Sequence, residues 1–119
     1  MNIIEEDSRN LNIRYDLPEE IWDKVPEIYS SMEGWLGFGD GKNGEENIPY
    51  WFNYSYTTKS ISASVEPSGL QFSASNIDEL EWEEWMKEIK VKATKVLGFK
   101  VGEIELGEVG NEIEWNENS

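Results

Sequence analysis

Hydrophobic and polar residues alternate early in the chain and then change to a helical spacing. Leu11, Ile13 and Tyr15 are separated by polar residues, which predicts a short strand with one buried face. From Pro18 onward the apolar positions have the spacing of an amphipathic helix, and they are Ile21, Trp22, Val25, Ile28, Tyr29 and Met32. Because Pro26 removes a backbone hydrogen bond inside this stripe, we expect a kink or two short helices that meet at Val25–Pro26.

The segment Glu33–Pro49 predicts a long loop, since it holds half of the ten glycines of the chain. Its Gly-x-Gly-x-Gly run at 37–41 lacks the Gly-Lys-Ser/Thr of a phosphate-binding loop, and Asp40 would repel phosphate. The same stretch differs from a calcium loop because Lys42 stands where a carboxylate is required. An ordered connection pinned by Trp35 and Phe38, or a loop that contacts a partner, remain as interpretations.

Three alternating segments follow, at 50–57, 60–65 and 70–75, and Pro67-Ser68-Gly69 supplies a tight turn between the last two. They predict an antiparallel meander with one apolar face and one face rich in Ser and Thr. Trp51 falls on the polar face of its segment, so it is the tryptophan predicted to be exposed.

A second helix is predicted from Asp78 to Leu97, capped by Ser75 or Asn76 and ended by Gly98. Its apolar stripe includes Trp82 and Trp85, and these two, like Trp22, are expected in the core. Alternation from Phe99 to Leu106 suggests a closing strand whose phase breaks near Gly102. The tail from Gly107 is expected to add an edge strand or to fray.

These elements predict one α+β domain, residues 1–119, with two helices packed on one face of an antiparallel meander. The ends, residues 1–8 and 116–119, are the segments where fraying is expected.

The charge of the chain narrows its partners. Twenty-five acidic and ten basic residues, with no histidine, give a net charge of −15. Such a chain repels nucleic acid and anionic membranes and attracts basic proteins. Without cysteine or histidine it has no thiol nucleophile, no imidazole base and no zinc ligand of either kind, so we expect no cofactor, no metal and no catalysis. The acidic N-terminus has no apolar segment, so we expect that it is not a signal peptide. No apolar run approaches the length of a membrane span, and we expect a cytoplasmic protein.

Acids that no nearby base balances lie in the glycine-rich loop and after Lys100, whereas the acids of the second helix are balanced by its lysines. Glu103 and Glu105 would project from one face of the closing strand, beside Glu45–Glu46 or the acidic helix turn. Aromatic residues on the loop and on the polar strand face would serve as apolar anchors. The predicted partner-binding residues are Trp35, Phe38, Asp40, Glu45, Glu46, Trp51, Glu103 and Glu105.

The small acidic domain, its Gly-Trp-x-Gly-x-Gly-Asp-Gly loop at 34–41 and the following Ile48-Pro49-Tyr50-Trp51-Phe52 resemble bacterial immunity proteins of polymorphic or contact-dependent toxin systems. The resemblance implies tight binding to a basic toxin domain, such as a nuclease, whose active site would be occluded. Two other hypotheses stay open. A nucleic-acid mimic would carry two rows of carboxylates at phosphate-like spacing, and a small enzyme or ligand-binding domain would need a pocket with two buried acids.

Overall fold

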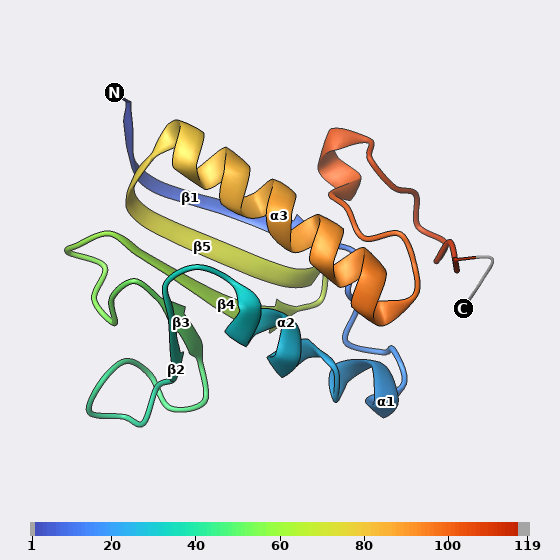
Figure 1. Ribbon diagram of the computed structural model, residues 1–119, viewed down its shortest axis with the longest axis horizontal. Helices are drawn as coiled ribbons and strands as arrows, with labels where there is room; N and C mark the ends of the chain where they lie inside the picture. Colours follow the sequence, from blue (N-terminus) through green and yellow to red (C-terminus); the bar gives the residue numbers. More distant parts are fainter. Residues whose placement is uncertain (1, 117–119) are drawn as a thin grey trace.

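The computed structural model describes residues 2–116, in which a five-stranded antiparallel sheet carries the helices (Figure 1). The strand order is β1-β5-β4-β3-β2, so β3, β4 and β5 form the predicted meander, β2 extends it by one strand, and β1 pairs beside β5. The strands are β1 (Ile3–Leu11), β2 (Trp35–Phe38), β3 (Pro49–Trp51), β4 (Ser60–Glu66) and β5 (Gly69–Asp78). The α+β fold is therefore as predicted.

The helices lie on one face of the sheet (Figure 1). They are α1 (Glu19–Trp22), α2 (Val25–Ser31) and α3 (Glu79–Leu97). Pro26 stands in the first turn of α2, where its missing N–H costs no hydrogen bond, and this confirms the two short helices predicted around it. Gly98 adopts the left-handed conformation that ends α3. The cap of α3 is Asp78, not Ser75 or Asn76, because β5 continues through both of those residues.

Aromatic rings form the centre of the core between sheet and helices. Trp51 packs edge-on against Tyr29 and Trp85, with ring centroids 5.2 and 5.1 Å apart, and Phe72 lies 5.6 Å from Trp85. Trp82 and Trp85 are buried as predicted. Trp22 is only partly buried, because its indole N–H reaches the carbonyl of Arg14 at the surface. Rigid rings packed in this way fix the positions of the strands that they contact.

The opposite face of the sheet is polar. Tyr50 pairs with Ser62, Ser62 with Ser73, and Ser73 with Ser8 of β1, where the two serine hydroxyls lie 3.3 Å apart. This row confirms the predicted face rich in small hydroxyl side chains.

The prediction for the first strand was wrong. β1 runs from Ile3 to Leu11 and not from Leu11 to Tyr15, so from Ile3 onward the expected fraying of residues 1–8 is replaced by pairing with β5. The acidic side chains did not prevent this pairing, because the ladder uses backbone groups and Asp7 accepts a hydrogen bond from the indole of Trp82 at 2.7 Å. Residues 117–119 of the other expected frayed end lie outside the described residues.

Two further elements differ from the prediction. The segment 50–57 is a strand only as far as Trp51, because Phe52 has a φ of 71° and its N–H turns to the carbonyl of Gly34. The predicted loop 33–49 contains β2, which makes it the first half of a hairpin. The predicted closing strand is absent from the described chain: after Phe99, which bridges to Trp115, the segment reaches only a short 3-10 helix, η1 (Ile104–Leu106).

Candidate functional site

Trp35 and Phe38 lie on β2, an edge strand of the sheet. Their rings meet edge-on with centroids 5.5 Å apart, and both rings contact Tyr29 of α2. Trp35 is half-buried, whereas Phe38 keeps 46% of its surface exposed. A bulge between Trp35 and Gly37 interrupts the pairing with β3, and short bulged edges discourage strand addition. The strand therefore exposes an aromatic side chain to solvent and presents a poor edge for strand pairing.

The loop that joins β2 to β3 is ordered by hydrogen bonds within it. The N–H of Gly39 donates to the carbonyl of Ile48 at 2.8 Å, and Asn47 donates back to Gly39. The N–H of Glu45 donates to the Tyr50 hydroxyl at 2.9 Å. Gly44 has a φ of +71°, and a Cβ there would lie 2.4 Å from the Tyr50 ring, so only glycine fits. This geometry favours the interpretation of the glycine run as a shaped connection.

Three acids project from this loop. The Asp40 carboxylate accepts the N–H groups of Asn43 and Lys42, at 2.8 and 2.9 Å, and these bonds hold the pKa of Asp40 below its usual value. Glu45 and Glu46 are exposed. Neither forms an ion pair with any residue in the range 2–116. The three carboxylates thus remain available for a cationic partner.

Trp51 was predicted to be exposed, and this prediction is wrong. Its side chain is 0% exposed, and its indole N–H donates to the Tyr29 carbonyl at 3.0 Å. The strand pairing explains the error: Trp51 is opposite Ile61 on the helix side of the sheet, and Tyr50 is opposite Ser62 on the polar side. Trp51 therefore lies in the core, where its ring packs against that of Trp35 with centroids 5.3 Å apart, and it is not exposed to a partner.

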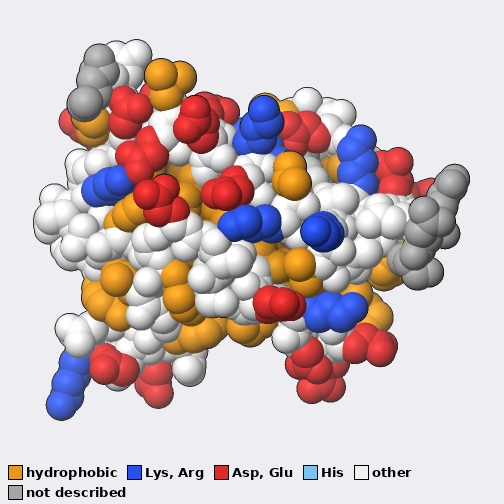
Figure 2. Space-filling view, in the orientation of Figure 1, with side chains coloured by type: hydrophobic (Ala, Val, Ile, Leu, Met, Phe, Trp, Pro, Cys, Tyr) orange, Lys and Arg blue, Asp and Glu red, His pale blue; other side chains and the backbone are white. Residues whose placement is uncertain are grey.

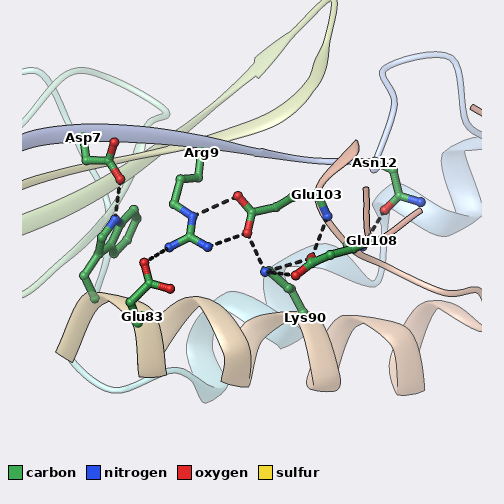
Figure 3. Close-up of polar contacts among 9 residues, drawn as sticks. Asp7, Arg9, Asn12, Glu83, Lys90, Glu103 and Glu108 are labelled. Carbon is green, nitrogen blue, oxygen red and sulfur yellow. Dashed lines mark hydrogen bonds and ion pairs between the residues drawn. The ribbon is translucent and has the colours of Figure 1, made fainter. Parts of the chain in front are cut away.

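Glu103 was also expected at the surface, but it is buried in an ion-pair network (Figure 3). Arg9 of β1 holds both of its carboxylate oxygens, at 2.8 and 2.6 Å, and Lys90 of α3 lies 2.5 Å from one of them. Burial alone would raise the pKa of Glu103, but the hydrogen bonds and charges of Arg9 and Lys90 together outweigh it and lower that pKa. The Glu103 hydrogen bond is also the main cause of the raised pKa of Arg9.

The network fixes the segment after α3 against β1 and α3. Lys90 also pairs with Glu108, whose carboxylate accepts the Glu103 N–H at 3.0 Å. The Asn12 side-chain amide donates to the Lys100 carbonyl and accepts the Gly102 N–H. The Asn12 N–H in turn donates to the Gly102 carbonyl. Glu103 and Glu105 were expected to project together from one face of a closing strand. Glu103 is buried and Glu105 is exposed on η1, so they share no such face. Sequence reasoning missed Arg9 and Lys90 because their partners are far away in the chain.

The predicted site residues therefore divide into two groups at opposite ends of the molecule (Figure 1). We call residues 35–51 the hairpin; it brings together Trp35, Phe38, Asp40, Glu45 and Glu46. The segment 99–110, at the other end, carries Glu103 and Glu105. Glu103 is the one buried acid among the described residues, and it is fully paired, so no second buried acid accompanies it there.

No match to this chain was found among protein-family models, curated proteins or solved structures. Within residues 2–116, no group of three acidic side chains is placed to hold a metal ion, and no helix is long and apolar enough to cross a bilayer. The hairpin is thus the candidate functional site on geometry and charge alone.

Proposed function

We propose that this protein is an acidic inhibitor, of the immunity or antitoxin kind, that binds a basic toxin domain through its hairpin. The observation that carries the proposal is the grouping of an exposed aromatic, Phe38, with three exposed carboxylates, Asp40, Glu45 and Glu46, on one ordered loop-and-strand unit. Interfaces commonly combine an aromatic anchor with a polar rim in this way.

The net charge of −15 supports the same proposal. It attracts a basic protein over several ångströms and raises the rate of encounter, up to about 10⁸–10⁹ M⁻¹s⁻¹ at low salt. The charge alone gives no position on the surface. The carboxylates of the hairpin, which form no ion pair within the described residues, would be the groups that the basic partner contacts.

The loop is suited to tight binding because it is already ordered. Its backbone hydrogen bonds and the Tyr29, Trp51 and Tyr50 rings beneath it hold the contact residues before a partner arrives. Less conformational entropy is then lost on association. Bound to a toxin, the hairpin would cover a basic active-site cleft and block its substrate, with no chemistry performed by this chain.

The test pairs this protein with the basic domain encoded by a neighbouring open reading frame. The two are co-expressed and co-purified, and the dissociation rate and protection from toxicity are measured for the wild type and for Glu45→Lys/Glu46→Lys. We expect the double variant to lose protection and to bind at least tenfold more weakly, because two attractive contacts become repulsive. Its melting temperature should stay near that of the wild type, since both residues are exposed.

Glu105→Lys/Glu112→Lys is the matched control. It makes the same change in net charge at exposed positions in the C-terminal part of the chain. If the control weakens binding as much as the hairpin variant, only overall charge matters and the hairpin is not the site. If the wild type binds no basic neighbour at all, the inhibitor proposal fails.

A further inference from the structure

An apolar groove runs beside the hairpin. It has a volume of about 410 Å³ and lies between α1–α2, the hairpin and the β4–β5 turn. Its walls are formed by Trp22, Pro26, Tyr29, Phe38, Ile48 and Val65, with other apolar residues beneath. Pockets that hold small ligands span about 300–1,000 Å³, so one large side chain has room here.

The groove is open to solvent at three of its apolar side chains. Phe38 is 46% and Val65 50% exposed, and Pro26 is also exposed. Its floor is firm, because the buried Tyr29 packs against Trp51, Phe72 and Phe38. Figure 2 shows hydrophobic side chains gathered below α3, over β2, β3 and α2, with several acidic and fewer basic side chains at the margin. An exposed apolar surface over a rigid floor is the usual form of an anchor site.

The charges around the groove select its occupant. None of the residues that line it is charged. The segments that form its walls, 22–29, 38–49 and 63–70, carry six acidic and two basic residues. We call the six acids of these segments the acidic rim; they are Asp23, Glu27, Asp40, Glu45, Glu46 and Glu66. A second copy of this chain would bring the same net charge of −15 and be repelled.

We infer that this groove receives a large apolar side chain from a basic segment of the partner protein, with lysine or arginine residues on either side of it meeting the acidic rim. The inference rests on the proposed function for the identity of the partner, and it adds the kind of sequence that the partner presents. The rim would select the sign of the charge, and the groove would select an aromatic or aliphatic residue between the charges.

A peptide experiment tests the groove without the toxin. The ¹⁵N-labelled protein is titrated at low salt with acetyl-Lys-Lys-Phe-Lys-Lys-amide and with the same peptide carrying Ser in place of Phe, and amide shifts are followed by NMR. We expect the Phe peptide to bind about tenfold to hundredfold more tightly, because one buried aromatic ring adds that much affinity. Shifts that depend on Phe should fall on Phe38, Ile48, Val65 and the Trp22 indole.

Val65→Arg and Val91→Arg form the matched pair of variants. The side chain of Val65 is 50% exposed and that of Val91 is 63% exposed. Both changes therefore add one positive charge at a surface position. Only Val65 lies in the groove, since Val91 is on α3. Val65→Arg should abolish the Phe-dependent shifts, and Val91→Arg should leave them intact.

Three outcomes overturn the inference: equal binding of the two peptides, Phe-dependent shifts confined to α3, or equal effects of the two arginine variants. The wild-type peptide comparison decides the matter even if Val65→Arg does not fold. Because no toxin is present, failure here leaves the hairpin charge-reversal test unaffected, and failure of that test leaves the groove result standing.

Discussion

The hairpin and the segment 99–110 carry acids that look alike in sequence and behave differently in the structure. Each segment holds three acids and one lysine, Lys42 in the hairpin and Lys100 in the segment 99–110. In segment 99–110, Glu103 is neutralised by Arg9, 94 residues away in the chain, and by Lys90 of α3. In the hairpin, Glu45 and Glu46 have no ion pair within the described residues.

The difference shows that an excess of local charge leaves acids unpaired only when no base from a distant part of the chain reaches them. The charge of segment 99–110 is used internally, to hold a stretch without sheet pairing against β1 and α3 (Figure 3). In the hairpin the loop is held by hydrogen bonds within its own backbone, and its glutamate side chains point to solvent. One region holds two parts of the chain together, and the other leaves its carboxylates exposed to solvent.

The largest expected effect comes from removing the buried carboxylate. Glu103→Ala should lower the free energy of unfolding by up to about 3–5 kcal/mol, because the mostly buried Arg9 and Lys90 would lose the anion that they share. Each would keep only a more exposed partner, Glu83 for Arg9 and Glu108 for Lys90. Glu105→Ala, at an exposed position in the same segment, should change it by less than about 0.5 kcal/mol. Urea unfolding at neutral pH measures both. Equal losses of unfolding free energy would show that the buried Glu103 contributes no more to stability than the exposed Glu105.

A smaller effect tests the order of the hairpin. Gly41→Ala should cost about 1–2 kcal/mol, because its φ is +91° although nothing lies within 4 Å of the new Cβ. Gly44→Ala should cost about 1–3 kcal/mol more, since its Cβ would also collide with the Tyr50 ring. Thermal unfolding of the two variants gives the comparison. If Gly41→Ala is the more harmful, the loop is not held by Tyr50 as described.

Much of the fold could be predicted from the sequence because it depends on local signals. The helical stripe of α3 with its final Gly98, the proline-divided helices α1 and α2 and the alternation in β4 and β5 are all patterns within one segment. β1 was misplaced because its pairing uses backbone groups that any side chain permits. β3 was drawn too long because nothing in the sequence marks Phe52 as a residue with positive φ.

Less of the candidate site could be predicted. The exposed acids of the hairpin and the aromatic Phe38 were found from the glycine run and its charges. Trp51 was misassigned because its strand ends at Trp51 itself, before Phe52, so the aromatic alternation that placed it on the polar face does not continue. Glu103 was misassigned because the ion pair with Arg9 joins opposite ends of the chain. The groove was missed since Tyr29, Phe38 and Val65 come together only after folding.

The smallest effect expected is a difference in how the two regions respond to acid. Burial would raise the pKa of Glu108, but hydrogen bonds from Lys90 and the Glu103 N–H, with the charge of Lys90, outweigh it and lower that pKa; loop N–H groups lower that of Asp40. A carboxylate whose pKa is lower in the folded state than in the unfolded state contributes stability that is fully present above the unfolded pKa. That contribution is lost as the pH falls through the folded pKa.

Urea unfolding from pH 7 to about pH 2 should therefore show the stability advantage of wild type over Glu108→Gln shrinking at the acid end. Asp40→Asn should follow the same course with a smaller amplitude, because the Asp40 carboxylate is exposed and pairs with no lysine or arginine in residues 2–116. An equal or larger amplitude for Asp40→Asn would show that the hairpin, and not the segment 99–110, contributes more of the acid-sensitive stability.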